Sequence, residues 1–451
     1  MSDSSNSSLL FWRDLTPFPV PLKAAGPSSP SILVIGGGVT GLVTAWVLLD
    51  QGYRVTIVAK EWASWGKQQR LTSQIAGALW EFPPAVCGQH TDAISLQHSK
   101  RWCMVAYHIW DALAASKELS ELSGVRIKGA DFFFPQVIEE DMKQMSKMLE
   151  LMASGVRGFR RDARIIKERN VNESYGAIDA YEHLAPVIDT DRSMEWLTVL
   201  VEQKGAKLVT ETIVGDLLDQ EPSLRAKYKA DVIINATGLA GTELAGDPSC
   251  YPIRGGLLRV INDGSDFSKL DHALTITADA FHNSNEIVFI VPRNDSILLI
   301  GGFTEPNEHQ LSLTVESPIV KRMRARCEAF LPDLKKARLD PEYPLAQGLR
   351  PFRQRNVRVE RELRPRESPA TGNAGSVPSR IVHTYGQGGS GWSLSFGCAG
   401  DVVVLVEEAL QDLPPQPMAI ETVAAEAPVA FSMPAVQLTH HKHTDRPMAR
   451  L

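Results

Sequence analysis

The sequence contains few cysteines, and their spacing shows no pattern. Five cysteines are scattered over 451 residues, and no two of them form a CxxC motif. An odd number without a pattern argues against a disulfide scaffold or a zinc site and fits a reducing compartment. We therefore expect neither structural disulfides nor a bound metal.

The sequence also lacks a strong excess of charge and a long apolar run. Its formal net charge is −6, with 22% charged and 43% hydrophobic residues, which is ordinary for a soluble globular protein and predicts no nucleic-acid partner. Residues 1–15 lack the basic start and apolar segment of a secretory signal. Residues 31–49 are mostly apolar but contain four glycines. Because a membrane span needs about 20 apolar residues, we interpret them as a buried strand, a turn and a helix, and expect no membrane partner.

The glycines of this segment form a G-x-G-x-x-G motif at Gly36, Gly38 and Gly41. Gly36 permits a tight turn, Gly38 lets the backbone approach a pyrophosphate, and Gly41 lets helix and strand pack closely. The N-terminus of the following helix offers free N–H groups to the phosphates. The motif predicts a dinucleotide site that includes Val39 and Thr40.

A second apolar strand over residues 53–59 completes the context that supports this motif. The acidic residue expected at the end of that strand is displaced, because Ala59 and Lys60 precede Glu61. We predict that Glu61 binds a ribose hydroxyl. Lys60 is either part of the same site or a surface charge.

A glycine-rich segment near the other end of the chain favours FAD over NAD. Residues 381–400 contain six glycines and run into the apolar segment 401–410. Glycine is costly to order, so such a cluster indicates a backbone that approaches a ligand closely. A flavin site needs a second segment that packs on the isoalloxazine end of the cofactor. We therefore expect segments from both ends of the chain to bind one FAD.

The length of the chain predicts two interleaved domains. The expected fold class is α/β, with an FAD-binding Rossmann-like (glutathione-reductase-like) domain and an interleaved antiparallel-sheet substrate domain. The FAD-binding domain is predicted at residues 31–85, 190–250 and 345–412, and the substrate domain at residues 86–189 and 251–344. We expect residues 1–30 to be a disordered arm and residues 413–451 a disordered tail. The basic segment 143–169 is interpreted as a solvated helix face or a surface insertion, and residues 366–379 as a surface loop.

Four segments together resemble the D-amino-acid oxidase family, which are FAD enzymes of the glutathione-reductase-like superfamily. These segments are VIGGGVTGL (34–42), LTSQIAGALWEFP (71–83), ADVIINATGLAG (230–241) with PIRGG (252–256), and GLRPFRQRNVRVERE (348–362) with IVHTYGQGGSGWSLSFGCA (381–399). His383 and Tyr385 match the family signature, whereas Thr384 stands where Asn is usual. The resemblance covers about residues 30–412.

The resemblance implies a non-covalent FAD and oxidative deamination of an amino acid, with dioxygen as the final oxidant and hydrogen peroxide as a product. It implies that Arg350 binds the substrate carboxylate, and that the carbonyl of Gly389 meets the substrate amino group. It further implies flavin contacts at Thr72, Ser73, Ala78, Leu79, Gly238, Gly388, Gly389, Ser390, Gly391, Trp392 and Ser393.

The expected substrate pocket departs from the family. A tyrosine that assists the arginine in the family is matched by Phe289, which has no hydroxyl, and other pocket tyrosines align with Asn285 and Thr304. Losing one charge-assisted hydrogen bond costs about 1.5–3 kcal/mol. Tyr175 and Tyr181 either compensate from a lid or are ordinary packing residues.

Three functions remain open at this point. The first is an oxidase of D-amino acids with neutral or apolar side chains, because residues 278–289 contain no extra arginine. The second is a flavin oxidase or dehydrogenase acting on a larger carboxylate-bearing intermediate. The third is a flavin-binding module without turnover.

The chain ends in Ala449, Arg450 and Leu451, which resembles the peroxisomal S-K-L address. We therefore expect a peroxisomal location and the import receptor as a partner, besides a small-molecule substrate, dioxygen and a second copy in a homodimer. His440, His441 and His443 are interpreted as solvent-exposed histidines of the tail.

Overall fold

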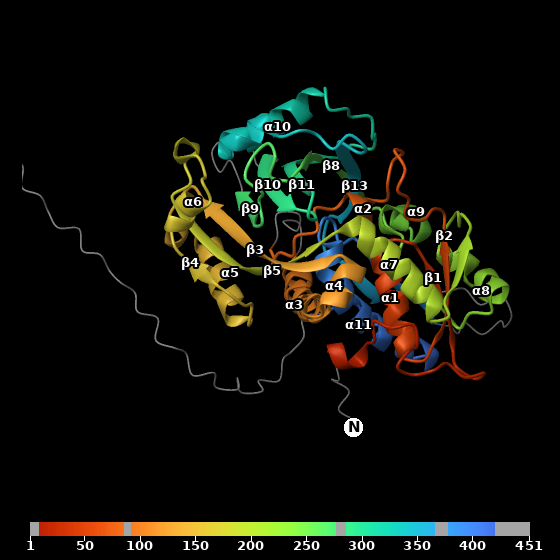
Figure 1. Cartoon of the computed structure of the whole chain (residues 1–451). Coiled ribbons are helices and arrows are strands. Elements are labelled where there is room, and N and C mark those ends of the chain that lie inside the picture. Colours follow the sequence, from red (N-terminus) through yellow and green to blue (C-terminus); the bar gives the residue numbers. More distant parts are fainter. Residues whose placement is uncertain (1–8, 85–91, 277–285, 366–377, 420–451) are drawn as a thin grey trace, which may run out of the picture. The chain divides into compact units, whose positions relative to one another are not determined.

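A computed structural model describes residues 9–84, 92–276, 286–365 and 378–419 (Figure 1). Asn285 and the tail residues 420–451, with the tripeptide Ala449–Leu451, lie outside the described residues, as does most of the loop predicted at 366–379. Among the described helices, none is both long and apolar enough to cross a membrane.

The smaller of two sheets contains the strands that carry both glycine-rich motifs. Its strand order is β14-β15-β7-β1-β2-β6. The bounds are β1 Ser31–Ile35, β2 Arg54–Ala59, β6 Lys207–Thr210, β7 Val232–Asn235, β14 Arg358–Arg361 and β15 Ile381–Tyr385. All neighbours are parallel except β14 and β15. Because β1 and β15 flank β7, the N-terminal and C-terminal glycine segments follow strands that are next-nearest neighbours.

Helices cover both faces of this sheet, which explains its continuous apolar strands. On one face Ile32 and Val34 join a core that includes α1 (Val39–Asp50), α3 (Ala93–Ala115), α7 (Thr190–Gln203) and α11 (Gly391–Leu410). On the other face Leu33 and Ile35 pack with α8 (Leu217–Tyr228). The segment 31–49 is therefore a strand, a turn and a helix, as predicted.

The larger sheet has nine strands in the order β12-β8-β11-β10-β9-β3-β5-β4, with β13 paired to β8. The bounds are β3 Val125–Phe134, β4 Arg160–Arg161, β5 Asp179–Ile188, β8 Cys250–Ile261, β9 Ala273–Ile276, β10 Glu286–Pro292, β11 Ile297–Phe303, β12 Glu305–Pro306 and β13 Leu345–Arg353. Neighbours are antiparallel apart from β3 and β9. Helix α10 (Pro318–Phe330) packs on β10 and β11 (Figure 1).

The remaining elements are short. The helices are α2 Thr72–Ile75, α4 Lys117–Ser123, α5 Met142–Ala153, α6 Arg164–Glu168 and α9 Gly241–Leu244, and the 3-10 turns are η1 Trp12–Asp14, η3 Ile138–Glu140, η4 Glu173–Tyr175, η5 Gly238–Ala240 and η6 Pro332–Lys336. The α/β class with an interleaved, largely antiparallel sheet is thus confirmed.

Two segments connect the domains that were expected from the sequence. Strand β13 belongs to the larger sheet, although residues 345–412 were expected in the FAD-binding domain. Helix α3, within the residues 86–189 expected in the substrate domain, packs against α11 beside the smaller sheet and also against β3 and β5 of the larger sheet. Apolar patterns identify a strand or a helix but not the partner against which it packs.

The prediction of a disordered arm is wrong for residues 9–30. Leu10 and Leu15 are buried, and the carboxylate of Asp50 accepts hydrogen bonds from the N–H of Thr16 (2.8 Å) and of Leu22 (3.1 Å). Asp50 also pairs with the buried amine of Lys204 at 2.6 Å. A buried carboxylate needs several donors, and the arm supplies two of them.

The basic segment 143–169 is largely exposed or half-buried, in agreement with the expected surface location, but several of its cations form ion pairs. Arg161 pairs with Glu139 and Asp179, and Arg160 pairs with Glu168 and Glu182. Within the same segment the side chain of Lys147 is only 9% exposed. Most of these cations are therefore neutralised by neighbouring carboxylates.

Candidate functional site

A cavity of about 480 Å³ is lined by segments of both sheets. The first set of lining segments follows β1, β2, β7 and β15 at their carboxyl ends, which is where ligands of open α/β sheets bind. The second set comes from β8, β10 and β13 of the larger sheet and from the strap at residues 71–79. The cavity thus joins the predicted cofactor and substrate sites.

The turn between β1 and α1 has the geometry that the glycine motif predicts. Gly36 has a φ of +123°, and a Cβ atom there would lie 2.3 Å from the carbonyl oxygen of Ala236. A Cβ at Gly41 would lie 2.0 Å from the carbonyl oxygen of Gly36. Both positions therefore require glycine. Gly41 lies behind the turn, however, and is not among the lining residues.

The N-termini of two helices face the cavity. Ser73 Oγ accepts the Val39 N–H at 3.0 Å, whereas the N–H group of the lining residue Thr40 reaches no acceptor among the described residues. At the start of α11 the N–H groups of Gly391, Trp392 and Ser393 likewise reach no described acceptor. Unpaired N–H groups at helix N-termini bind anionic groups, so this donor set fits the pyrophosphate and the pyrimidine carbonyls of FAD.

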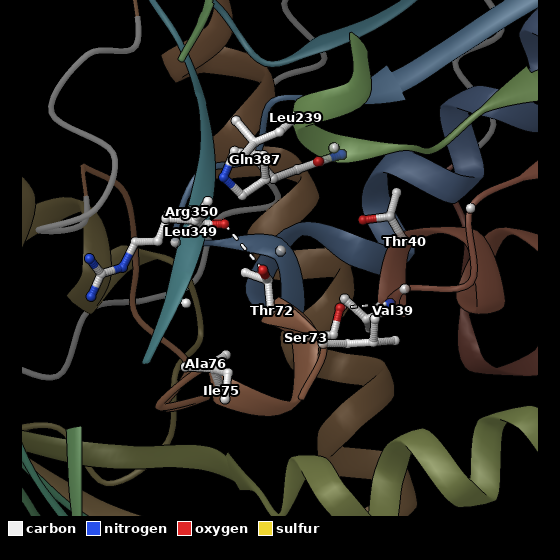
Figure 2. Close-up of a pocket in the computed structure, with 18 of the residues that line it drawn as sticks. Val39, Thr40, Thr72, Ser73, Ile75, Ala76, Leu239, Leu349, Arg350 and Gln387 are labelled. Atoms are coloured by element: carbon white, nitrogen blue, oxygen red, sulfur yellow. Dashed lines mark hydrogen bonds between the residues drawn. The ribbon is translucent and has the colours of Figure 1, made fainter. Parts of the chain in front are cut away.

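The strap at residues 71–79 joins the two helix ends. Trp392 Nε1 donates to the carbonyl of Ser73 at 2.9 Å, and Thr72 Oγ1 donates to the carbonyl of Leu349 at 3.2 Å. Figure 2 shows Thr72 and Ser73 between Val39 on one side and Arg350 on the other. The strap therefore runs along the length of the cavity and carries the predicted Ala78 and Leu79 in its lining.

The carboxyl end of β2 supplies the lining residues Lys60 and Glu61, so both predicted residues reach the cavity. Glu211 lies in the same part of the lining and was not predicted. Its carboxylate is bound by Lys227 and accepts from the hydroxyl of Tyr228 at 2.8 Å. Glu61 forms no ion pair with a described residue, whereas Glu211 pairs with Lys227, so Glu61 is the more available carboxylate.

Arg350 lies on β13 with its guanidinium against Gly255 of β8. A Cβ at Gly255 would lie 2.1 Å from Nη1 and 2.4 Å from Nη2 of Arg350, so only glycine leaves room for this cation. Nη1 donates to the carbonyl of Phe303 at 3.3 Å. No carboxylate of the described residues pairs with Arg350, and in Figure 2 its side chain extends away from Thr72. The cation is therefore available to an acid.

Phe289 lies in the lining with its ring against the strap. A Cβ at Gly77 would lie 2.3 Å from Cε1 and 2.6 Å from Cζ of Phe289. The two tyrosines considered as substitutes do not line the cavity: Tyr175 packs edge-on against Phe330 and Tyr181 stacks on Phe132, each at 5.1 Å between ring centroids. They are packing residues, as the second interpretation held.

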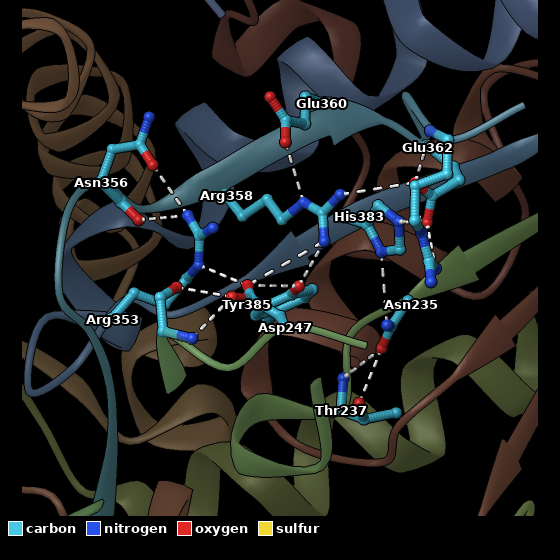
Figure 3. Close-up of polar contacts among 12 residues, drawn as sticks. Asn235, Thr237, Asp247, Arg353, Asn356, Arg358, Glu360, Glu362, His383 and Tyr385 are labelled. Carbon is cyan, nitrogen blue, oxygen red and sulfur yellow. Dashed lines mark hydrogen bonds and ion pairs between the residues drawn. The ribbon is translucent and has the colours of Figure 1, made fainter. Parts of the chain in front are cut away.

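His383 lies behind the cavity wall rather than in it (Figure 3). Its Nδ1 faces Asn235 Nδ2 at 3.3 Å, and its Nε2 faces Glu362 at 3.2 Å. Burial lowers the pKa of His383, so the ring is neutral and donates from Nε2 to Glu362. Burial raises the pKa of Glu362, but hydrogen bonds from His383 and Arg364 outweigh it and hold the pKa below its ordinary value. Asn235 in turn accepts from the hydroxyl of the lining residue Thr237 at 2.7 Å.

Tyr385 supports the part of the cavity wall that residues 237–240 form. Its hydroxyl donates to Asp247 at 2.8 Å and accepts from Arg358 at 2.7 Å. A Cβ at Gly241 would lie 2.7 Å from the Tyr385 ring, so α9 packs directly on it. Burial raises the pKa of Asp247, but hydrogen bonds from Ser249, Tyr385 and Arg353 and the charge of Arg353 lower it to about 2. This network fixes the turn at residues 237–240 that lines the cavity.

The structure brings together nearly all of the residues predicted for the site. Of the predicted set only Gly41 is outside the lining, and Phe289, Arg350, Gly238 and the loop 388–393 all contribute to it. Sequence reasoning missed Glu81, Gln387 and Glu211. Gln387 lies inside the glycine-rich segment 381–400 and Glu81 inside the segment 71–83, so both had a usable signal, whereas Glu211 lies in no motif.

The chain belongs to a family of FAD-dependent oxidoreductases of the D-amino-acid oxidase type, since the family model described as FAD dependent oxidoreductase matches residues 31–404. The chain is similar to a D-amino-acid oxidase of Rubrobacter xylanophilus, with 30% identity over 379 residues that cover 84% of this chain and 96% of that protein. The resemblance noted in the sequence is confirmed.

Solved structures share the fold. The glycine oxidase of Bacillus cereus has a TM-score of 0.60 at 17% identity, and the match covers 87% of this chain and 100% of that chain. The FAD-bound L-alpha-glycerophosphate oxidase of Mycoplasma pneumoniae has a TM-score of 0.58 at 15% identity, over 84% of this chain and 95% of that chain. At such identities these likenesses show the fold alone.

Proposed function

We propose that the protein is an oxidase of D-amino acids with neutral side chains, producing the imino acid, which hydrolyses to the 2-oxo acid and ammonia, and hydrogen peroxide. The observation that carries the proposal is Arg350. Its guanidinium occupies a space left by Gly255, has no carboxylate partner among the described residues, and lines the same cavity as two helix N-termini.

Arg350 binds the substrate carboxylate in this proposal. A planar fork of donors matches a carboxylate in two parallel hydrogen bonds, and a lysine in its place would not. The carbonyl of Gly389 accepts from the substrate amino group, and the ring of Phe289 bounds the substrate on the side of the strap. Three fixed groups orient the α-carbon, which is the main contribution that a protein makes to such a reaction.

Bound FAD supplies the electron acceptor for the α C–H bond. The N–H groups of Gly391, Trp392 and Ser393 present partial positive charge at the N-terminus of α11, and they would stabilise negative charge on a reduced cofactor bound there. We propose that the cofactor is held non-covalently, because the described lining residues include no cysteine or histidine to attach it. Dioxygen as the final oxidant and a homodimer are parts of the same proposal.

A second candidate is oxidation of a larger amine that also carries a carboxylate. Phe289 favours it, because its apolar ring cannot donate a second hydrogen bond to the carboxylate of a small substrate. Phe289→Tyr separates the two candidates. For a small D-amino acid the added hydroxyl should improve KM by about tenfold or more, whereas for a larger apolar substrate it should lower activity.

Oxidation of D- and L-amino acids by the FAD-loaded protein, with peroxide as the readout, tests the proposal directly. The expected result is turnover of D-isomers alone, at rates that saturate with substrate. Turnover of L-isomers would contradict the proposed stereochemistry. Flavin reduction without air, combined with no peroxide in air, would indicate a dehydrogenase rather than an oxidase.

A further inference from the structure

Glu81 is a charged residue in the wall of the cavity for which the proposed reaction has no use. It follows Trp80, whose N–H bonds to the carbonyl of Pro186 at 2.9 Å and so fixes the strap against β5. The Glu81 side chain is 19% exposed, and it shares the lining with Gly77 and Phe289. The position of this carboxylate is therefore determined by the sheet.

The partner of Glu81 comes from the basic segment 143–169. Lys147 of α5 donates from Nζ to Glu81 Oε1 at 2.8 Å and to the carbonyl of Pro84 at 3.0 Å. The amine is buried, and it supplies the positive charge that a carboxylate in this environment requires. Oε2 of Glu81 accepts no hydrogen bond from any described residue. A carboxylate has about four acceptor positions, so one oxygen remains available to a ligand.

The rest of this wall is apolar and aromatic. Trp80 packs on Tyr107 at 4.7 Å between ring centroids, and Tyr181 stacks on Phe132. Burial raises the pKa of the Tyr181 hydroxyl, and the negative charge of Glu81 raises it further. The same two causes raise the pKa of the Cys103 thiol. Glu81 thus supplies the negative charge in this part of the wall, and the Tyr181 hydroxyl and the Cys103 thiol stay protonated.

We propose that Glu81 is a specificity-determining residue, which accepts a hydrogen bond from a hydroxyl or ammonium group on the side chain of the substrate. The inference rests on the proposed function, because Arg350 must hold the carboxylate for Glu81 to meet the other end of the same molecule. It adds a requirement to the proposed substrate class: the side chain of the D-amino acid ends in a hydrogen-bond donor, which is either a neutral hydroxyl or a cationic ammonium group. An acceptor that is desolvated on binding rejects an analogue that lacks the donor.

Pairs of D-amino acids that differ only at the last heavy atom test the inference with the FAD-loaded enzyme. Suitable pairs of increasing length are 2-aminobutyrate and serine, norvaline and homoserine, and norleucine and ornithine. We expect kcat/KM to favour the donor-bearing member of at least one pair by about tenfold or more, which corresponds to one hydrogen bond to a charged group.

The double variant Glu81→Met/Lys147→Met should abolish this preference. Replacing both members of a buried ion pair by apolar side chains of similar length usually preserves the fold, and the flavin spectrum and thermal melting confirm that. The readout is the ratio of kcat/KM within each pair, which a general loss of activity does not change. The matched control is Lys100→Met/Glu150→Met, because that ion pair joins α3 to the same helix α5 and neither residue lines the cavity.

The outcomes separate the inference from the proposed function. If D-amino acids reduce the flavin but no pair shows a preference, or if the double variant keeps the preference within about twofold, the inference is overturned and the oxidase proposal stands. If no D-amino acid reduces the flavin anaerobically, both are overturned. Loss of the preference in the control variant as well would assign the effect to the packing of α5 and also overturn the inference.

Discussion

Gly255→Ala should separate carboxylate binding from stability, because the new methyl group meets a side-chain tip rather than the backbone. The Cβ would lie 2.1 Å from Nη1 and 2.4 Å from Cζ of Arg350. Real Cβ atoms do not approach so closely, so the guanidinium must move. Since it is the end of a long flexible side chain, the free energy of unfolding should change by less than about 1 kcal/mol.

Carboxylate binding should fall much further. Displacing the guanidinium removes charge-assisted hydrogen bonds worth about 1.5–3 kcal/mol, which is a loss of roughly 10- to 150-fold in affinity. The assay is titration of the FAD-loaded protein with benzoate, followed through the flavin absorbance, together with kcat/KM for a D-amino acid. A control at another position of the same strand, Leu258→Met, keeps the volume of a buried side chain outside the cavity lining and should leave affinity within about threefold.

A double-mutant cycle decides whether the effect acts through Arg350. Arg350→Ala alone should weaken carboxylate binding at least as much as Gly255→Ala, and the double variant should be no weaker than Arg350→Ala. Such non-additivity is expected for residues in contact. Additive losses in the double variant, or unchanged benzoate affinity in Gly255→Ala, would refute the assignment of Arg350 as the carboxylate site.

Further expectations concern the cofactor, pH and location. The purified protein should be yellow and release intact FAD on denaturation, and a colourless supernatant from protein that also fails to bind added FAD would contradict this. Because the pKa of Asp247 is lowered to about 2 in the folded protein, its contribution to stability, about 2 kcal/mol, is present above pH 4 and is lost as pH falls towards 2. The difference in unfolding free energy between wild type and Asp247→Asn should therefore shrink over that interval, and a constant difference would refute the role of this carboxylate. A reporter fused to residues 412–451 should enter peroxisomes and remain diffuse in the cytosol without Ala449–Leu451, whereas diffuse signal from the intact fusion would remove the proposed location.

The parts of the site that the sequence predicted are those whose chemistry is local. Gly36, Gly38 and Gly41 act within one turn, so their spacing carries the whole geometric requirement. The loop 388–393 is equally local, because a cluster of glycines before a helix has few other uses. The pairing of β1, β7 and β15 in one sheet follows from the parallel α/β pattern around these motifs.

The parts that could not be predicted depend on partners distant in the chain. Glu81 and Lys147 are 66 positions apart, and nothing in the composition of 143–169 distinguishes the one lysine that turns inward from its paired neighbours. The order of residues 9–30 depends on the buried charge of Asp50, which a local pattern of serines and prolines does not show. The sequence pattern of β13 predicts a strand but does not indicate which of the two sheets it joins.

The position of β7 between β1 and β15 has a consequence for biosynthesis. Ile32 pairs with Val232, and Val382 pairs with Ile234, so the floor beneath the cofactor needs strands from the beginning, the middle and the end of the polypeptide. A chain emerging from the ribosome cannot assemble this floor until β15 and α11 have been translated, and contacts between residues so far apart in sequence form slowly. These strands can therefore enclose FAD only after the chain has been synthesised through α11, which ends at Leu410.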